Sequence, residues 1–281
     1  MISEPKILNH HEDDELLEKS TSLNDFIPNR HLRHDDIAKF KEVISNSLEQ
    51  LNSVTGKTPE LQALADSLHA FNEFIKLKRT TEYHQPNSPE DYVAITACNK
   101  AIIDAILSIK RTERQNIKTQ AHVFWQILRE IAGAFGILAQ EMNYLQNGLT
   151  AEIAVQKVLQ ERGENLLGKD FERADFSSAS EDALQKHDID VTFKNGDRKY
   201  YQIKMNHLDR PRGNFEERDL TKDISPGIVI ISLREIDEIR INYFRTEQFF
   251  DPDTGQPTAD FYDQMASGFY MQRYERQRHR P

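Results

Sequence analysis

The first half of the chain carries apolar residues that recur every three or four positions. This spacing places them along one face of a helix. Ser88, Pro89 and Glu90 supply an N-cap, a proline at the first helical position and an early acid, which together mark a helix start. The pattern predicts helices over residues 37–56, 58–75, 88–109 and 116–146. Four such amphipathic helices are typical of a bundle or a stack of helical hairpins.

After Gly163 the pattern changes to an alternation of apolar and polar residues, which is typical of strands. Asn195-Gly196 lies between two alternating segments and is a strong signal for a tight hairpin turn. The predicted strands are residues 187–193, 199–205, 228–233 and 236–244. The third of them is a continuous apolar run, the kind found in strands buried on both faces. With a final helix over residues 260–276, this order predicts a mixed β-sheet flanked by helices.

Asn147 and Gly148 interrupt the helical pattern, and Thr150 can cap a further helix that runs to Gly163. A domain boundary is therefore expected there. We predict a flexible acidic leader, a helical domain and a domain of the α/β class, which cover residues 1–33, 34–147 and 148–281.

Composition narrows the class of protein. No run approaches the ~18 consecutive apolar residues that a membrane span needs. Cys98 is the single cysteine, which excludes an internal disulfide and any multi-cysteine zinc site and fits a reducing compartment. We expect a cytoplasmic protein without a membrane anchor. Because the formal net charge is −10, any site for nucleic acid must be a local basic patch.

The predicted hairpin carries the candidate chemistry. Alternation along its second strand places Gln202 and Lys204 side by side on one face. Folding about the Asn195-Gly196 turn pairs Asp190 with a residue close to position 201, so Asp190 can reach the same end. A carboxylate, an amide oxygen and an ammonium that converge there form a seat for a hard divalent cation. Phosphodiester hydrolysis uses such a metal to activate water, and a cation to orient that water or neutralise developing charge.

Glu152 adds a fourth candidate. The apolar stripe of its helix consists of Ala151, Ala154, Val155, Val158 and Leu159. At 100° per residue Glu152 lies on the edge of this stripe, so its carboxylate can face the sheet. Asp188 competes with Asp190 for the strand aspartate, but it precedes the strand and is expected to be solvated or to act behind the ligands.

These residues resemble the PD-(D/E)XK nuclease superfamily over roughly Leu149 to Leu233. In that family a helix glutamate precedes a hairpin with an aspartate and then an acid-x-lysine, which matches Glu152, Asp190 and the triplet Gln202-Ile203-Lys204. Gln202 departs from the usual acid and is similar to the variant of the Mrr-type endonucleases. The resemblance implies a restriction-endonuclease-like fold and a Mg²⁺- or Mn²⁺-dependent nuclease. Its metal ligands would be Asp190, Gln202 and Glu152, and Lys204 would position the water.

The expected substrate is DNA rather than RNA, a preference that comes from the resemblance. We expect low sequence specificity because no base-reading motif accompanies the site. Arg210 and Arg212 follow the site and are candidates for contact with the nucleic-acid backbone. Three alternatives stay open: an inactive nuclease fold whose helical half recruits a protein partner, a defence or toxin effector, and a homodimer.

Two other features receive structural interpretations. Asp251, Asp253 and Gly255 are similar to the start of a calcium loop, but the glycine is one position early and the closing acid is missing. We interpret this segment as a turn. Trp125 lies at helical spacing with other aromatic residues and is expected in the core or at a contact between domains.

Overall fold

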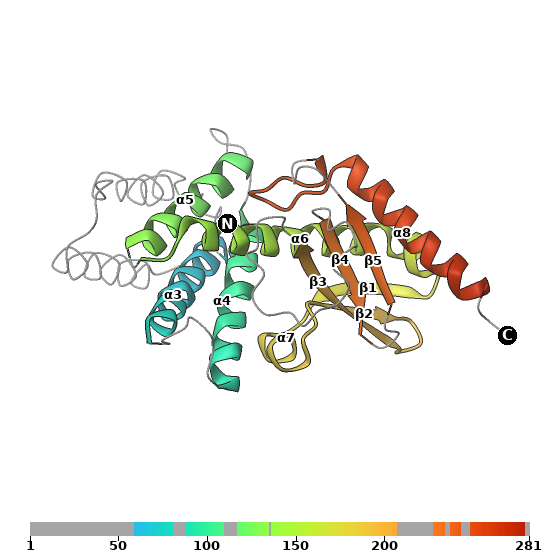
Figure 1. Cartoon of the computed structure of the whole chain (residues 1–281), viewed down its shortest axis with the longest axis horizontal. Coiled ribbons are helices and arrows are strands. Elements are labelled where there is room, and N and C mark those ends of the chain that lie inside the picture. The colour runs from blue at the N-terminus through green and yellow to red at the C-terminus, as the bar shows by residue number, and fades with distance from the viewer. Residues whose placement is uncertain are drawn as a thin grey trace, which may run out of the picture.

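The computed structural model describes residues 59–80, 88–109, 117–134, 136–206, 227–233, 237–242 and 248–278. Figure 1 shows three helices gathered on one side, a β-sheet and a C-terminal helix on the other, and one long helix that extends across both. The predicted leader and the predicted helix over residues 37–56 lie outside the described residues.

The helical side consists of α3 (Pro59–Thr80), α4 (Pro89–Ser108), α5 (Ile117–Ala134) and the first turns of α6 (Ala139–Leu167). Ser88 caps α4 as predicted: its hydroxyl accepts from the backbone N–H of Asp91, and the Asp91 carboxylate accepts from the backbone N–H of Ser88. Cys98 is buried on the inner face of this helix. The helices enclose a core of their own, with Phe71, Ile102, Trp125 and Leu128 among its fully buried side chains.

The long helix α6 corrects the prediction that the helical pattern breaks at Asn147-Gly148. The chain is helical through both residues, and Thr150 is no N-cap because its hydroxyl donates to the carbonyl of Gln146 one turn earlier. The interruption lies instead between α5 and α6, where Gly136 adopts a φ of +80°. The expected boundary therefore falls inside a continuous helix, whose buried residues contribute to the cores on both sides.

The sheet contains β1 (Phe171–Phe176), β2 (Ile189–Phe193), β3 (Arg198–Asn206), β4 (Gly227–Ser232) and β5 (Asp237–Asn242). Its strand order is β1-β2-β3-β4-β5, and all neighbouring strands are antiparallel. The prediction of a mixed sheet was wrong. It relied on the order of helices and strands, which does not fix strand direction; the apolar run of β4 reports burial, and an inner antiparallel strand can also be covered on both faces. The molecule is thus of the α+β class.

Two elements between α6 and β2 were not predicted. They are the edge strand β1 and the short helix α7 (Ala179–Gln185), which lies against α4. The last helix, α8 (Ala259–Arg278), packs on β5 and α6 and confirms the predicted C-terminal helix.

The hairpin of β2 and β3 has the predicted register and alternation. Asp190 pairs with Tyr200, and Ile189 pairs with Tyr201, within one residue of the expected pairing. Tyr201 and Ile203 face the core, where they meet the apolar stripe of α6. Gln202 and Lys204 alternate with them and therefore lie on the opposite face of β3.

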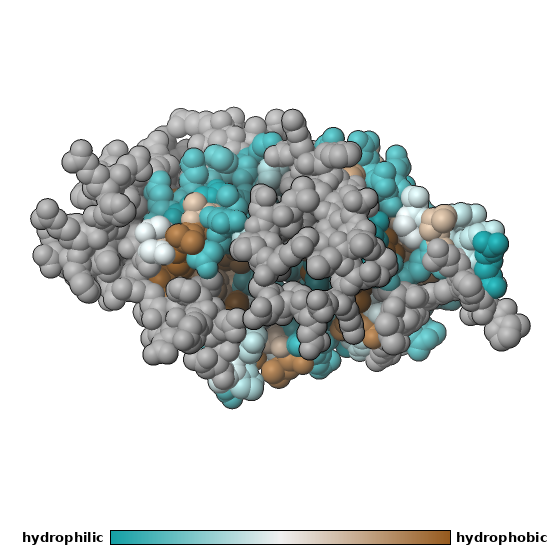
Figure 2. Space-filling model, in the orientation of Figure 1, coloured by the Kyte–Doolittle hydropathy of each residue, from teal (hydrophilic) through white to brown (hydrophobic). Residues whose placement is uncertain are grey.

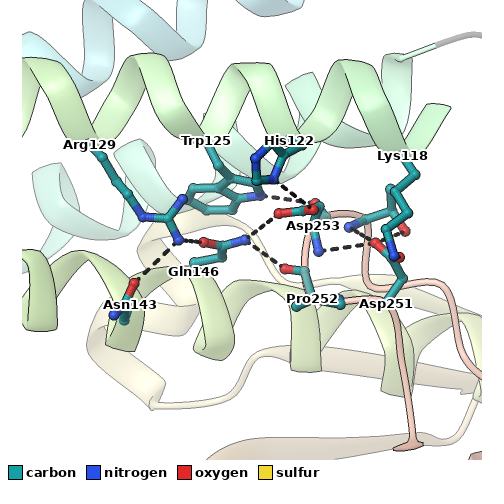
Figure 3. A network of polar contacts seen from close by, with 10 residues as sticks. Lys118, His122, Trp125, Arg129, Asn143, Gln146, Asp251, Pro252 and Asp253 are labelled. Atoms are coloured by element: carbon teal, nitrogen blue, oxygen red, sulfur yellow. Dashed lines mark hydrogen bonds and ion pairs between the residues drawn. The ribbon is translucent and has the colours of Figure 1, made fainter. Parts of the chain in front are cut away.

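A loop that follows β5 docks onto the helical side (Figure 3). The Trp125 Nε1 donates to the carbonyl of Asp253 at 2.9 Å, and the Gln146 Nε2 donates to that of Pro252 at 2.8 Å. The Asp251 carboxylate accepts from the backbone N–H groups of residues 253 and 254, which closes the loop as a side-chain-stabilised turn. The turn interpretation and the predicted contact of Trp125 between the two parts of the chain are both confirmed.

In the orientation of Figure 2 the described surface is mostly hydrophilic, and its hydrophobic patches are small and separate. Among the described helices, none has the combined length and apolar character that a membrane crossing needs.

Candidate functional site

Glu152 lies on α6, on the edge of the stripe that packs against the sheet. All five stripe residues named above are buried, which confirms the predicted helix face. The Glu152 side chain is 14% exposed, and its Oε2 is buried with no hydrogen-bond partner among the residues that the structure describes. Burial, and then the neighbouring charge of Asp188, raise the pKa of this carboxyl well above its ordinary value. A buried carboxylate oxygen without a hydrogen bond makes the acid costly to ionise, so this position favours a nearby cation.

Asp188 lies immediately before β2 and is buried. Its backbone N–H donates to the carbonyl of Tyr201 at 2.8 Å, and its Oδ2 accepts from the backbone N–H of Ile203 at 2.5 Å. The carboxylate is thereby fixed beside the middle residue of the Gln202-Ile203-Lys204 triplet. Burial, and then the nearby Asp182 carboxylate, raise the pKa of Asp188 to about 7.

Asp182 of α7 and Lys100 of α4 lie near Glu152 and Asp188. Lys100 of α4 extends its Nζ to 2.8 Å from the Asp182 Oδ2 and 3.9 Å from the Glu152 Oε2. The ammonium also lies 5.7 Å from the centre of the Phe176 ring. Burial lowers the pKa of Lys100, but the charges of Glu152 and Asp182 outweigh it and the net pKa is raised. We call Lys100, Glu152, Asp182 and Asp188 the acid cluster.

The local sequence explains how α7 presents Asp182. Ser178 accepts from the backbone N–H of Glu181, and the Glu181 carboxylate accepts from the backbone N–H of Ser178, so the helix begins with a capping box. Lys186 ends it in the left-handed conformation, with a φ of +60°. The chain then turns directly into β2, which brings the first turn of α7 and the start of β2 together.

Asp190 belongs to a second, adjoining group. Its Oδ1 lies 2.9 Å from the His187 Nε2 and accepts from the Ser177 hydroxyl at 3.0 Å. Glu181, His187 and Asp190 each offer a ligand atom within 4.8 Å of the others. The His187 ring is tilted against the Tyr200 ring, with 4.7 Å between their centres. Asp190 is thus buried among polar neighbours.

The structure distributes the predicted residues over these two groups. Glu152 lies in the acid cluster, but the strand acid beside it is Asp188. Of the two alternatives expected for Asp188, solvation is excluded, because the side chain is buried beside the backbone of β3 and the acids of α6 and α7, and the position behind the ligands stays a prediction. Gln202 is half-buried and Lys204 is exposed. Arg210 and Arg212 lie outside the described residues.

Sequence analysis missed Lys100 and Asp182. The helix that carries Asp182 has a readable signal, since Ser178 and Glu181 stand at the spacing of a capping box. No local signal links Lys100 to residues more than fifty positions away, because that contact depends on how α4 lies against α7. Lys100 is one turn from the buried Ile103, and this spacing places Lys100 at the edge of the core-facing side of α4.

The acid cluster offers the type of donor atom that a hard divalent cation prefers, although among the described residues the three ligand atoms that lie within 4.8 Å of one another belong to Glu181, His187 and Asp190. Its carboxylate oxygens are the ligand type that Mg²⁺ and Mn²⁺ prefer, and the Oε2 of Glu152 is a buried acceptor without a hydrogen-bond donor among the described residues. Comparisons of the chain with protein-family models, with curated proteins and with solved structures find no match.

Proposed function

We propose that the chain is a metal-dependent nuclease that hydrolyses phosphodiester bonds, with a sheet and flanking helices that resemble the restriction-endonuclease-like fold. One observation carries the proposal. Glu152 of α6 and Asp188 before β2 lie close enough for the charge of Asp188 to raise the pKa of Glu152, and Asp188 hydrogen-bonds Ile203 inside the Gln-x-Lys triplet. The helix acid, the strand acid and the triplet of the resembled family therefore adjoin one another.

Each residue has a role in this proposal. Glu152, Asp188 and the amide oxygen of Gln202 hold Mg²⁺ or Mn²⁺, and Lys204 orients the attacking water or neutralises charge on the phosphate. When bound, the divalent cation polarises the scissile phosphate and makes water a stronger nucleophile at neutral pH. Asp188 is buried and the Glu152 side chain is 14% exposed, so little solvent competes with a cation for these carboxylates.

Asp190 remains a candidate ligand beside Asp188. Asp188 and Asp190 are two positions apart in the sequence, and both side chains are buried. Both residues also lie beside β3. They differ in their neighbours, because Asp188 contacts the acid cluster whereas Asp190 contacts His187 and Ser177. We assign the ligand role to Asp188 and a supporting role to Asp190, which holds His187 and the end of β1 against the hairpin.

The test is a cleavage assay with plasmid DNA, single-stranded DNA and structured RNA at low salt, with Mg²⁺, Mn²⁺ or a chelator. We expect cleavage of DNA that the chelator abolishes. Glu152→Gln and Asp188→Asn should each remove cleavage, and Asp190→Asn should reduce it less. Glu164→Gln is the matched control, because Glu164 lies on the same helix with a side chain that is 65% exposed.

The outcomes separate the parts of this proposal. Cleavage that survives the chelator overturns the metal mechanism, and cleavage of RNA alone overturns the preference for DNA. If Asp190→Asn abolishes cleavage while Asp188→Asn does not, the ligand role returns to Asp190.

The alternative is a nuclease fold that binds without cleaving, with its helical side recruiting a protein partner. Gln202 favours it, because an amide supplies one negative charge less than the usual acid. Gln202→Glu separates the two functions. An enzyme should change its preference between Mg²⁺ and Mn²⁺, whereas a binding module should cleave nothing with either residue.

A further inference from the structure

The side chains of Glu181, His187 and Asp190 converge at the junction of α7 and β2. One ligand atom of each lies within 4.8 Å of the other two. The His187 side chain is 2% exposed, and its Nε2 lies 2.9 Å from the Asp190 Oδ1. The two atoms are not aligned as a hydrogen bond, and the buried Nε2 has no hydrogen-bond partner among the residues that the structure describes. A buried polar atom of this kind calls for a partner such as a bound ion.

The distance between His187 and Asp190 suits two ligands of one metal ion. Zn²⁺ binds imidazole nitrogen and carboxylate oxygen at ~2.0–2.2 Å, so two of its neighbouring ligand atoms lie roughly 3 Å apart. The Nε2 and Oδ1 atoms already have this separation. Imidazole is also a preferred donor of transition metals, whereas the acid cluster offers carboxylate oxygens alone. The two groups therefore suit different classes of cation.

We infer that Glu181, His187 and Asp190 form a second metal site, which binds a divalent transition-metal ion and fits Zn²⁺ best. His187 supplies the nitrogen ligand, and the two acids supply oxygen ligands whose charges balance that of the ion. Three protein ligands leave a further position for water. This site does not depend on the proposed function, because its residues are outside the acid cluster.

Neighbouring groups hold the two acids in place. The Asp190 Oδ1 accepts from the Ser177 hydroxyl at 3.0 Å, a contact of the kind that orients metal ligands. The Glu181 Oε2 accepts from the backbone N–H of Ser178 at 3.0 Å, and its partly buried side chain can rotate toward the other two ligands. The Arg198 guanidinium opposes a cation, but it is 46% exposed and its Nη1 lies 3.9 Å from the other Asp190 oxygen, Oδ2.

An ion at this site would connect α7 to the hairpin. Glu181 belongs to α7, Asp190 to β2, and His187 to the short connection between them. Asp182 and Asp188, the sequence neighbours of Glu181 and His187, belong to the acid cluster. The ion would therefore stabilise the segment that carries two acids of that cluster, without contacting them.

The experiment measures the affinity of the full chain for Zn²⁺ by competition with a chromogenic chelator, which needs no catalytic activity. His187→Phe removes the nitrogen ligand but keeps a ring against Tyr200. We expect it to weaken binding by at least about tenfold, the smallest usual cost of losing even a group that only supports a ligand. His69→Phe is its control, because His69 is exposed on α3 and its loss should leave the affinity unchanged.

Glu181→Gln tests an acid ligand with the helix start preserved, because glutamine can also accept from the backbone N–H of Ser178 in a capping box. It too should weaken Zn²⁺ binding by at least about tenfold. Asp182→Asn is the matched control on the same turn of α7. It removes the same charge from outside the converging group, so screening should limit its effect to less than about fivefold.

Equal Zn²⁺ affinity in the wild type, His187→Phe and Glu181→Gln overturns the proposal, because the ion is then held by other groups. A loss in Glu181→Gln no larger than that in Asp182→Asn also overturns it, and this comparison decides should His187→Phe not fold. Zn²⁺ binding that Asp188→Asn abolishes and Glu181→Gln retains assigns the ion to the acid cluster, with the same consequence. The proposed function fails separately, since the absence of DNA cleavage leaves these affinities unchanged.

Discussion

The carboxylate of Asp188 accepts a hydrogen bond from the backbone N–H of Ile203 at 2.5 Å, and this contact ties the start of β2 to the centre of the Gln-x-Lys triplet. Charge-assisted hydrogen bonds of this kind are stronger than neutral ones. The bond holds an acid that burial makes costly to ionise against the strand where the candidate chemistry lies. Burial thus disfavours the ionised form of Asp188, which is the form that the proposed metal site requires.

The first prediction concerns the pH dependence of stability without metal. The folded protein raises the pKa of Asp188 to about 7, whereas an unfolded chain gives an aspartate a pKa of ~3.9. Between these values the folded state holds a proton that the unfolded state has released. The free energy of unfolding should therefore fall as pH rises from about 4 to about 7. Asp188→Asn should flatten this fall, by at most about 4 kcal/mol.

Urea unfolding at pH 5 and pH 8 with a chelator measures this effect. Asp263→Asn is the control, since Asp263 is exposed on α8. Glu152 should leave a residual slope in Asp188→Asn, because burial also raises its pKa. Equal slopes in the wild type and Asp188→Asn contradict the prediction.

The sequence was sufficient for features that depend on local pattern. The alternation of Tyr201, Gln202 and Ile203 predicted which side chains face the core, because a strand has a period of two. Strand direction was not predictable in this way, since an apolar strand such as β4 looks the same in parallel and antiparallel sheets. The contact between Lys100 and Asp182 joins residues distant in sequence, and only the packing of α4 on α7 creates it.

The second prediction uses Cys98 as a reporter of the helical side. This thiol is 1% exposed, and burial raises its pKa to about 12. Because the thiolate is the reactive form, thiol reagents should modify the folded protein very slowly at pH 8. Cys98 is the single cysteine, so the signal has one source. Labelling should accelerate in urea together with the loss of helical circular dichroism, and fast labelling in buffer contradicts the burial.

The third prediction tests the contact between α6 and the loop after β5 (Figure 3). Gln146 donates to the Pro252 carbonyl and to the Asp253 carboxylate, at 2.8 and 2.9 Å. Gln146→Ala leaves these acceptors without that donor, which should cost about 1–3 kcal/mol of unfolding free energy. Trp125, the single tryptophan, hydrogen-bonds the same loop and reports its release by a red shift of fluorescence. Asn143→Ala, one turn earlier and exposed, should cost less than about 0.5 kcal/mol.

The fourth prediction compares two glycines that share a backbone conformation but differ in their surroundings. Gly255 in the docked loop has a φ of +65°, and Gly196 in the hairpin turn has a φ of +87°. An alanine at either position pays the strain of a left-handed conformation, about 1–2 kcal/mol. A Cβ at position 196 meets no atom within 4 Å, so strain is the whole expected cost there.

At position 255 a Cβ would lie 2.6 Å from the Thr150 carbonyl oxygen and 2.7 Å from the Ile153 Cβ. Both belong to α6, where backbone atoms cannot rotate away as a long side chain can, so the loop must move off the helix. Gly255→Ala should therefore destabilise the protein by at least about 1 kcal/mol more than Gly196→Ala, measured by urea unfolding of both variants. Its Trp125 fluorescence should also shift, because the Asp253 carbonyl moves with the loop. Equal losses of stability in the two variants would mean that the loop does not press against α6 at Gly255.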